Sequence, residues 1–254
     1  MANSIDKLYF SQLALSTYLT CQLKFRRRYL EELYWPRPGT AAVELGNDFH
    51  AAAERYFLTG EKEEYPPPLG RMLENLYSFR PLEPGTVFLP EQQLRFNSDI
   101  KLVAKYDLIV LADRVYIYDW KTDRKKIRKT YYQSSMQTRV YRYLLVVGAS
   151  GYWDSRVIKP RDVVMCYWNP NYPHEPLYLE YTERRFKQDA AAISGLIEEI
   201  RNRPWDEFLT AGNKAACSVC EYSPLCHGKP GIGDEDFDTG DLSLSWDEID
   251  EIPY

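Results

Sequence analysis

Residues 101–121 read KLVAKYDLIVLADRVYIYDWK, and this stretch decides the fold. Two runs within it, residues 101–111 and 115–119, are rich in β-branched and aromatic residues, which favour strands. Only three residues separate the runs, a connection short enough for a tight hairpin. The sequence therefore predicts two adjacent antiparallel strands at this point.

The register of the hairpin follows from its turn. With Asp113 at the centre, Leu111 faces Val115, and counting back along both strands places Asp107 opposite Asp119. Opposed residues have Cβ atoms about 5 Å apart, and like charges there repel each other. A divalent cation relieves such repulsion, and carboxylate oxygens suit Mg²⁺ or Mn²⁺. The pair is therefore a candidate metal site.

The triplet that ends the hairpin adds a cation to this site. Side chains of a strand alternate between its two faces, so Lys121 shares a face with Asp119 while Trp120 points the other way. Two carboxylates and an ammonium group are thus expected to converge.

Around the hairpin, hydrophobic periodicity predicts a central mixed β-sheet flanked by helices, in an α/β or α+β arrangement. Ser11 is a candidate N-cap for the first helix. Helices are expected from there to about residue 32 and at residues 41–58, 69–77, 130–147 and 183–203, and further strands at residues 87–96, 163–168 and 177–181.

Composition and charge are those of an ordinary soluble protein, with 254 residues, 44% hydrophobic and 27% charged. No apolar run is long enough to cross a bilayer and the start lacks a signal peptide, which predicts a cytoplasmic protein without a membrane partner. Residues 230–254 contain nine acids and no Lys or Arg; removing those nine charges changes the net charge from −5 to +4. We expect a domain at residues 1–228 and a disordered acidic tail at 229–254, which either solubilises the chain or binds a protein partner.

Three cysteines lie close together near the end of the chain, at Cys217, Cys220 and Cys226. In a chain with no secretion signal, such spacing indicates a metal site rather than disulfides. Cys21 is the preferred fourth ligand, because Cys166 lies in an apolar strand pattern where a free thiol behaves as a small hydrophobe. Four sulfurs suit either Zn²⁺ or an iron-sulfur cluster, and the ligand type leaves both open.

Two predicted helices each carry a pair of candidate site residues four apart, hence on one face. One presents Gly46 and His50, and the other presents Gln137 and Tyr141. A lone helical His is more typical of a structural residue than of a ligand, whereas for Gln137 and Tyr141 the pattern leaves core packing and a functional role equally open. The basic run that follows the hairpin, which includes Lys125 and Lys126, is either a solvated loop or a phosphate-binding segment.

The ordered set of these motifs resembles the PD-(D/E)XK nucleases, specifically the RecB-like branch. The cysteine layout looks like its iron-sulfur members, among them CRISPR-associated adaptation nucleases and AddB-type repair nucleases. The resemblance spans Cys21 to Cys226 and departs from the family in two places: Ala104 replaces a common Gly, and Asp119 replaces the commoner Glu. It implies a restriction-endonuclease-like core with the C-terminal cysteine cluster docked on the N-terminal helix.

The resemblance also implies residue roles and cofactors. Asp107, Asp119 and Lys121 are implied to be catalytic, with His50, Asp107, Asp119 and the Trp120 carbonyl binding Mg²⁺ or Mn²⁺ and Glu91 as a weaker accessory acid. Contacts with nucleic acid are implied for Gln137 and Tyr141, and also for two residues of the basic run, Lys125 and Lys126. A [4Fe-4S] cluster, with zinc as the alternative, is implied for the four cysteines Cys21, Cys217, Cys220 and Cys226.

We therefore expect a metal-dependent deoxyribonuclease, an exonuclease on single-stranded DNA or DNA ends in repair or CRISPR adaptation. A catalytically inactive DNA-binding protein of the same fold and an RNA-processing nuclease are the alternatives.

Overall fold

A computed structural model describes the chain in four segments, residues 5–34, 40–149, 157–211 and 214–228. The predicted acidic tail, residues 229–254, lies outside them. The chain divides into two compact units: residues Met1–Pro38 with Ser194–Tyr254, and residues Gly39–Ile193. Among the described residues, no helix is both long enough and apolar enough to cross a membrane.

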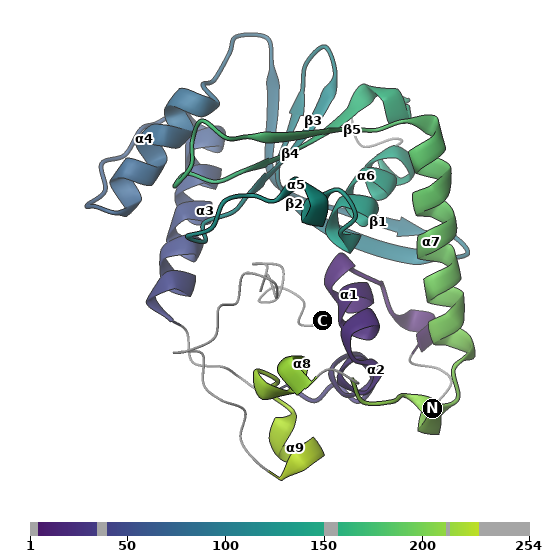
Figure 1. Ribbon diagram of the computed structural model, residues 1–254. Coiled ribbons are helices and arrows are strands. Elements are labelled where there is room, and N and C mark those ends of the chain that lie inside the picture. The colour runs from purple at the N-terminus through teal and green to yellow at the C-terminus, as the bar shows by residue number, and fades with distance from the viewer. Residues whose placement is uncertain (1–4, 35–39, 150–156, 212–213, 229–254) are drawn as a thin grey trace. The chain divides into compact units, whose positions relative to one another are not determined.

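The larger unit contains a five-stranded mixed sheet in the order β1-β2-β3-β4-β5 (Figure 1). Only β3 and β4 run parallel; the other neighbouring strands are antiparallel. This confirms the predicted fold class. The strands are β1 (Val87–Asn97), β2 (Lys101–Leu111), β3 (Val115–Trp120), β4 (Val163–Trp168) and β5 (Leu177–Glu180).

The hairpin between β2 and β3 has the predicted register. Leu111 lies opposite Val115, and pairing continues to Leu108 opposite Tyr118. Regular pairing ends there, one position before Asp107 and Asp119. The alternation of β-branched and aromatic residues fixed this register, because a slip of one residue would move every buried side chain to the other face.

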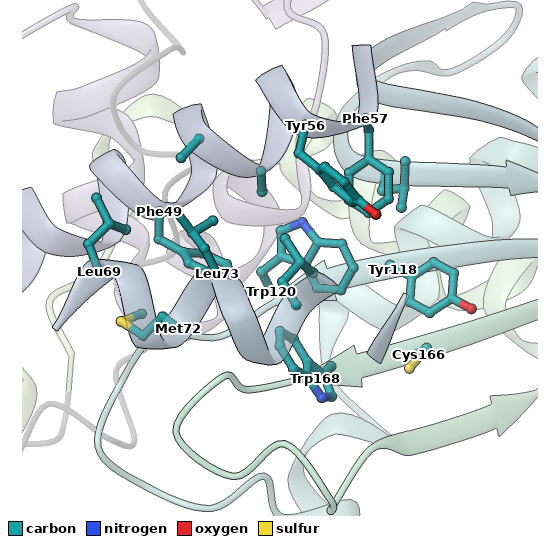
Figure 2. Packing of buried hydrophobic residues seen from close by; sticks show 14 of the residues in the cluster. Phe49, Tyr56, Phe57, Leu69, Met72, Leu73, Tyr118, Trp120, Cys166 and Trp168 are labelled. Carbon is teal, nitrogen blue, oxygen red and sulfur yellow. The ribbon is translucent and has the colours of Figure 1, made fainter. Parts of the chain in front are cut away.

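Helices cover both faces of the sheet. Alternate residues of β3 and β4, including Trp120 and Trp168, pack with Phe49 of α3 (Ala41–Thr59) and Leu73 of α4 (Leu69–Phe79) (Figure 2). The intervening residues face the opposite side, where Gln137 of α6 (Met136–Gly148) donates a hydrogen bond to Asp119. The same strand therefore supplies core residues to one face and functional candidates to the other.

Two predicted helices are interrupted, in each case at a residue whose side chain caps the next helix. The predicted first helix breaks at Cys21, which is extended (φ −157°, ψ 107°) and whose Sγ accepts a hydrogen bond from the Lys24 amide. The predicted helix at 130–147 breaks before Ser135, whose hydroxyl caps α6. Such local side-chain bonds compete with a continuous helix. The resulting helices are α1 (Gln12–Thr20), α2 (Gln22–Phe25), a π-helical turn (Arg26–Leu30), α5 (Lys129–Tyr132) and α6.

The smaller unit combines the N-terminal helices with the C-terminal segment. Its later elements are a 3-10 turn (Trp205–Glu207), α8 (Lys214–Ser218) and α9 (Ser223–His227). The helix α7 (Glu183–Asn202) has residues in both units. Within the smaller unit, Lys24 forms an ion pair with Glu221 at 3.0 Å, and Arg26 donates to the Trp205 carbonyl. Polar contacts thus join the N-terminal helices to the segment that follows α7.

A buried ion pair joins α6 to α7 in the larger unit. Arg142 and Asp189 are 2% and 0% exposed, and Arg142 Nη2 lies 3.2 Å from Asp189 Oδ2. We expect Asp189→Ala to lower the free energy of unfolding by about 3–5 kcal/mol, because it leaves a buried guanidinium without its counter-charge. Urea denaturation measures the change, with the exposed acid of Asp48→Ala as a control expected to stay within about 0.5 kcal/mol. A loss below about 1 kcal/mol for Asp189→Ala would show that the pair is dispensable.

Candidate active site

Three potential metal ligands converge from three elements of the larger unit. His50 comes from α3, Glu91 from β1 and Asp107 from β2. One ligand atom from each lies within 4.8 Å of the other two, and His50 Nδ1 is 3.5 Å from Asp107 Oδ1. All three are partly buried. The two carboxylates suit Mn²⁺ or Mg²⁺, and the imidazole adds a nitrogen donor of the kind that transition metals prefer, so the residues fit a divalent cation.

Glu91 was only a weaker candidate in the sequence, yet it belongs to this group. Its backbone has a positive φ of 50°, which is uncommon for a residue other than glycine. The β1–β2 pairing keeps the same register on both sides of it, from Pro90 opposite Leu108 to Gln92 opposite Tyr106. Glu91 therefore lies across from Asp107. Only strand pairing reveals this, since the sequence around Glu91 carries no motif.

Asp119 has different partners from those of Asp107. Asp119 Oδ2 lies 2.8 Å from Lys121 Nζ, and Asp119 Oδ1 accepts a hydrogen bond of 2.6 Å from Gln137 Nε2. Gln137 Oε1 in turn accepts a bond of 3.2 Å from Lys121 Nζ. All three side chains are buried. Gln137 therefore fixes both the carboxylate and the ammonium group.

The two groups are linked through the backbone of β3. The amide of Trp120 donates a 2.6 Å hydrogen bond to Asp107 Oδ2. Each acid at the end of the hairpin is thus satisfied by its own partners. Tyr141, by contrast, contributes its backbone: its carbonyl accepts a bond of 3.0 Å from the Tyr106 hydroxyl, and the two rings lie 4.9 Å apart.

Aromatic rings enclose Lys121, a feature that the sequence did not predict. Its Nζ lies 5.9 Å from the ring centre of Tyr132 and 5.7 Å from that of Tyr167. The Tyr167 hydroxyl is 2.7 Å from the Thr138 hydroxyl, which donates to the Tyr132 carbonyl. Cation–π contacts favour the charged amine. No motif marks these residues, which lie in an apolar strand and at helix ends.

The electrostatics of the two groups differ. Burial and the nearby Asp107 raise the pKa of Glu91 to about 7. Burial opposes the charge of Asp107, but His50 and the Trp120 amide outweigh it and hold the pKa of Asp107 below its usual value. Burial likewise lowers the pKa of His50, and Asp107 overcomes that effect and raises it. In the metal-free protein Glu91 is therefore partly protonated near neutral pH, and His50 keeps its proton to a higher pH than an ordinary imidazole does.

The pKa of Lys121 moves far upward. Burial alone lowers it, but Asp119 and then the phenols of Tyr132 and Tyr167 raise it well above the ordinary value. Lys121 is therefore an ammonium ion at neutral pH. It can supply positive charge but cannot act as a general base.

The proton on the Glu91 carboxyl group predicts how metal binding depends on pH. A carboxyl group with a pKa of about 7 is mostly protonated at pH 6 and mostly ionised at pH 8, and a metal ion competes with that proton. We expect Mn²⁺ affinity to rise between pH 6 and pH 8. At pH 6, Glu91→Gln should release about one proton fewer on binding, measured by calorimetry in buffers of different ionisation enthalpy. Unchanged proton release in Glu91→Gln would contradict the assignment, and the exposed Glu44→Gln serves as the control.

The two predicted nucleic-acid-binding lysines lie just beyond β3 and are exposed. The amide of Lys125 donates to Asp123 Oδ1 at 2.8 Å, and Lys126 Nζ lies 2.6 Å from Glu175 Oε1. Lys126 thus has an acidic partner that the sequence did not predict.

The cysteines of the smaller unit influence one another. Burial raises the pKa of the Cys217 thiol, and Cys21 and Cys226 raise it further. Burial also raises the pKa of Cys220, with a smaller contribution from Cys21. Arg27 Nη1 donates a hydrogen bond to Cys226 Sγ at 3.1 Å. Cys166, in contrast, lies in the buried cluster of Figure 2, within the sheet of the larger unit.

Comparison with known proteins identifies the class. A family model of the PD-(D/E)XK nuclease superfamily matches residues 9–86 and 69–227, most of the chain, so the protein belongs to that superfamily and is a nuclease. A crystal structure of a protein from Eubacterium rectale, proposed to be an exonuclease, is similar with a TM-score of 0.56 and 10% identity over 94% of each chain. At that identity the likeness shows the fold alone. No curated protein matches the chain.

Proposed function

We propose that this protein is a RecB-like, metal-dependent deoxyribonuclease that acts as an exonuclease on single-stranded DNA or on DNA ends. The single observation that carries the proposal is the pairing of a His50–Glu91–Asp107 ligand group with a buried Asp119–Lys121–Gln137 group, bridged by the Trp120 amide. An ammonium group fixed beside a group of potential metal ligands is what charge stabilisation at a phosphodiester requires, which supports catalysis over binding alone. The superfamily membership supports phosphodiester hydrolysis.

The residues of the site suggest their roles in the reaction. Glu91, Asp107 and the Nδ1 or Nε2 atom of His50 would hold the cation, with Asp119 and the Trp120 carbonyl as further candidate ligands. A divalent cation bound there supplies an activated water molecule and neutralises charge on the phosphodiester. His50 and Glu91 must release their protons before they can bind it, which favours activity at neutral to alkaline pH.

Lys121 stabilises the transition state in this proposal. Its ammonium group, held by Asp119 and Gln137, provides a fixed positive charge for the negative charge that develops on the phosphate oxygens. The surrounding rings of Tyr132 and Tyr167 exclude water and leave the charge poorly screened, so each interaction is stronger than in solvent. Gln137 is therefore a positioning residue for both catalytic side chains.

The decisive test compares substrates under one condition. Purified protein with Mn²⁺ or Mg²⁺ is incubated with end-labelled single-stranded DNA, blunt duplex DNA, circular single-stranded DNA and RNA of the same sequence. We expect metal-dependent release of labelled products from linear single strands, little from circular DNA, and none after addition of a chelator. Cleavage of circles would indicate an endonuclease, cleavage of RNA alone an RNA-processing enzyme, and binding without cleavage a catalytically inactive relative.

We also propose that Cys21, Cys217, Cys220 and Cys226 bind a structural [4Fe-4S] cluster, within a nuclease domain of residues 1–228. Besides burial, Cys21 and Cys226 raise the pKa of Cys217, which supports a shared site. The likeness of the cysteine layout to that of iron-sulfur nucleases favours the cluster over zinc. Anaerobic purification should give a brown protein with broad absorption near 400 nm that bleaches on reduction, whereas zinc binding would give a colourless one.

The biological setting is part of the proposal. We place the activity in the cytoplasm, in DNA repair or CRISPR adaptation, and the acidic tail, residues 229–254, would contact a protein partner. Comparison of full-length protein with a truncation at Gly231 tests the tail. Unchanged DNA affinity and partner binding after truncation would remove that part of the proposal.

A further inference from the structure

Two loops leave the sheet side by side, next to Lys121. Because β3 and β4 are parallel, both strands end at the same edge, with Trp120 paired to Trp168. The Lys121 amide donates to the Trp168 carbonyl at 2.8 Å, which keeps the strands together at that edge. We call residues 122–126 the basic loop and residues 169–176 the β4–β5 loop. Ligands of sheets with parallel strands commonly bind beyond such carboxyl ends.

Side chains of the β4–β5 loop bind every backbone carbonyl of residues 122–125. Asn169 Nδ2 donates to the carbonyls of Asp123 (2.8 Å) and Lys125 (3.2 Å). Asn171 Nδ2 donates to those of Thr122 (3.1 Å) and Asp123 (3.2 Å). The Tyr172 hydroxyl donates to that of Arg124 at 2.6 Å. The basic loop has no helix or strand of its own, so these bonds define its conformation.

Asn169 is the central member of this set. It is 1% exposed, and besides its two donated bonds its Oδ1 accepts a bond of 2.8 Å from the Asn171 amide. A buried polar side chain with three bonds is costly to replace by a group that cannot make them. Its bonds secure both loops at once.

The bonds between the two loops affect which groups of the basic loop can meet an anion. Carbonyl oxygens repel anions, and here four consecutive carbonyls point at the β4–β5 loop. The side chains of Arg124 and Lys125 are exposed, immediately after the catalytic strand. Lys126 is also exposed, but its ammonium lies 2.6 Å from Glu175 and 5.5 Å from the ring centre of Tyr172. All three side chains are thus exposed beside the end of β3, and that of Lys126 is paired with an acid.

We propose that the β4–β5 loop holds the basic loop as a phosphate-binding surface, on which Arg124 and Lys125 contact the DNA backbone beside Lys121, with Asn169 as the positioning residue. The inference deepens the proposed function and rests on it. Lys126 has a secondary role, because its ion pair with Glu175 limits its attraction to phosphates. That pair therefore limits how tightly the surface binds the DNA backbone.

The first test measures equilibrium binding of fluorescent single-stranded DNA in a chelator, where no cleavage occurs. Each lost phosphate contact lowers the slope of log affinity against log salt by about 0.7. We expect Arg124→Ala/Lys125→Ala to lower the slope by about 1.4 and the affinity at 0.1 M salt by about tenfold. Arg161→Ala removes an equally exposed cation just before β4, at the other end of that strand, and should change neither. Equal slopes for all three proteins would overturn the proposal.

The second test separates positioning from charge. Asn169→Leu removes no charge, yet we expect it to lower the salt slope by about 1 and to raise the KM for DNA more than it lowers kcat, because the cations are no longer held in place. Tyr172→Phe removes a single bond and should have a smaller effect in the same direction, which keeps the test valid if Asn169→Leu folds poorly. Glu175→Gln should steepen the slope by releasing Lys126. An unchanged slope in folded Asn169→Leu and Tyr172→Phe would refute the positioning role.

The tests of binding and of cleavage can contradict their two proposals independently. If wild-type protein cuts DNA but the basic-loop variants bind with wild-type salt dependence, the proposal of a phosphate-binding surface is wrong and the proposed nuclease activity is supported. If wild-type protein cuts nothing while the variants show the expected lower slope of log affinity against log salt, the phosphate-binding surface is supported and the catalytic proposal is wrong.

Discussion

Lys121→Met should reduce kcat for DNA cleavage by about 10²–10³-fold without weakening Mn²⁺ binding. Methionine keeps the length of the buried stem but removes the ammonium that lies 2.8 Å from Asp119 and 3.2 Å from Gln137. Loss of one preorganised charge in a water-excluded site costs about 2.7–4 kcal/mol of transition-state stabilisation. Single-turnover cleavage at saturating metal, together with Mn²⁺ calorimetry, checks both parts of the expectation.

Two control variants make this result interpretable. Lys187→Met makes the same chemical change at an exposed position of α7 and should leave the rate within about twofold. Lys121→Met also leaves Asp119 buried without its counter-charge, which should lower stability by a few kcal/mol. In Asp119→Asn/Lys121→Met the stability should recover while activity stays lost. Wild-type rates in folded Lys121→Met, at a temperature where circular dichroism shows it to be native, would mean that Lys121 serves the fold rather than the reaction.

Asp107→Asn should weaken Mn²⁺ binding by about 100-fold and reduce cleavage at fixed metal concentration by about 10³-fold. The asparagine oxygen can still accept the bond from the Trp120 amide, so the hairpin end should keep its geometry. What is lost is an anionic ligand of the group formed with His50 and Glu91. Removal of that charge should also lower the pKa of His50, which Asp107 raises in the native protein. Calorimetry and histidine NMR titration measure the two effects.

Metal rescue distinguishes this variant from the first. A higher Mn²⁺ concentration should restore part of the activity of Asp107→Asn, because its defect lies in binding, and none of the activity of Lys121→Met. Asp48→Asn, an exposed acid on the same helix as His50, should bind Mn²⁺ as the wild type does. Equal metal affinity in Asp107→Asn and wild type would remove Asp107 from the ligand set.

The hairpin shows how far local pattern reaches. Its strand bounds and its register were predictable, because alternation of buried residues and a short turn leave one pairing that buries the correct face. The same alternation placed Asp119 and Lys121 on one face, and the structure brings them within 2.8 Å. The predicted closeness of Asp107 to Asp119 was less informative, since Asp107 pairs with His50 and the Trp120 amide while Asp119 pairs with Lys121 and Gln137.

Helix boundaries depended on whether a polar side chain caps the backbone. The predicted start after Ser11 is confirmed, because its hydroxyl accepts from the Ala14 amide. The breaks at Cys21 and before Ser135 were missed, because both residues lie within apolar periodicity that continues across them. A thiol or hydroxyl that bonds the backbone locally ends a helix without changing that periodicity.

The sequence by itself determined the strand order around the hairpin, the faces on which Asp107, Asp119 and Lys121 lie, and the spacing of the cysteines, because each depends on residues close together in the chain. Only the tertiary structure decided which groups meet. Glu91 joins His50 through the pairing of β1 with β2, Gln137 reaches Lys121 through the packing of α6 on the sheet, and Asn169 fixes the basic loop because β3 and β4 run parallel. Those contacts join residues up to 46 positions apart, a separation over which periodicity conveys no information and only packing of the whole sheet selects one arrangement.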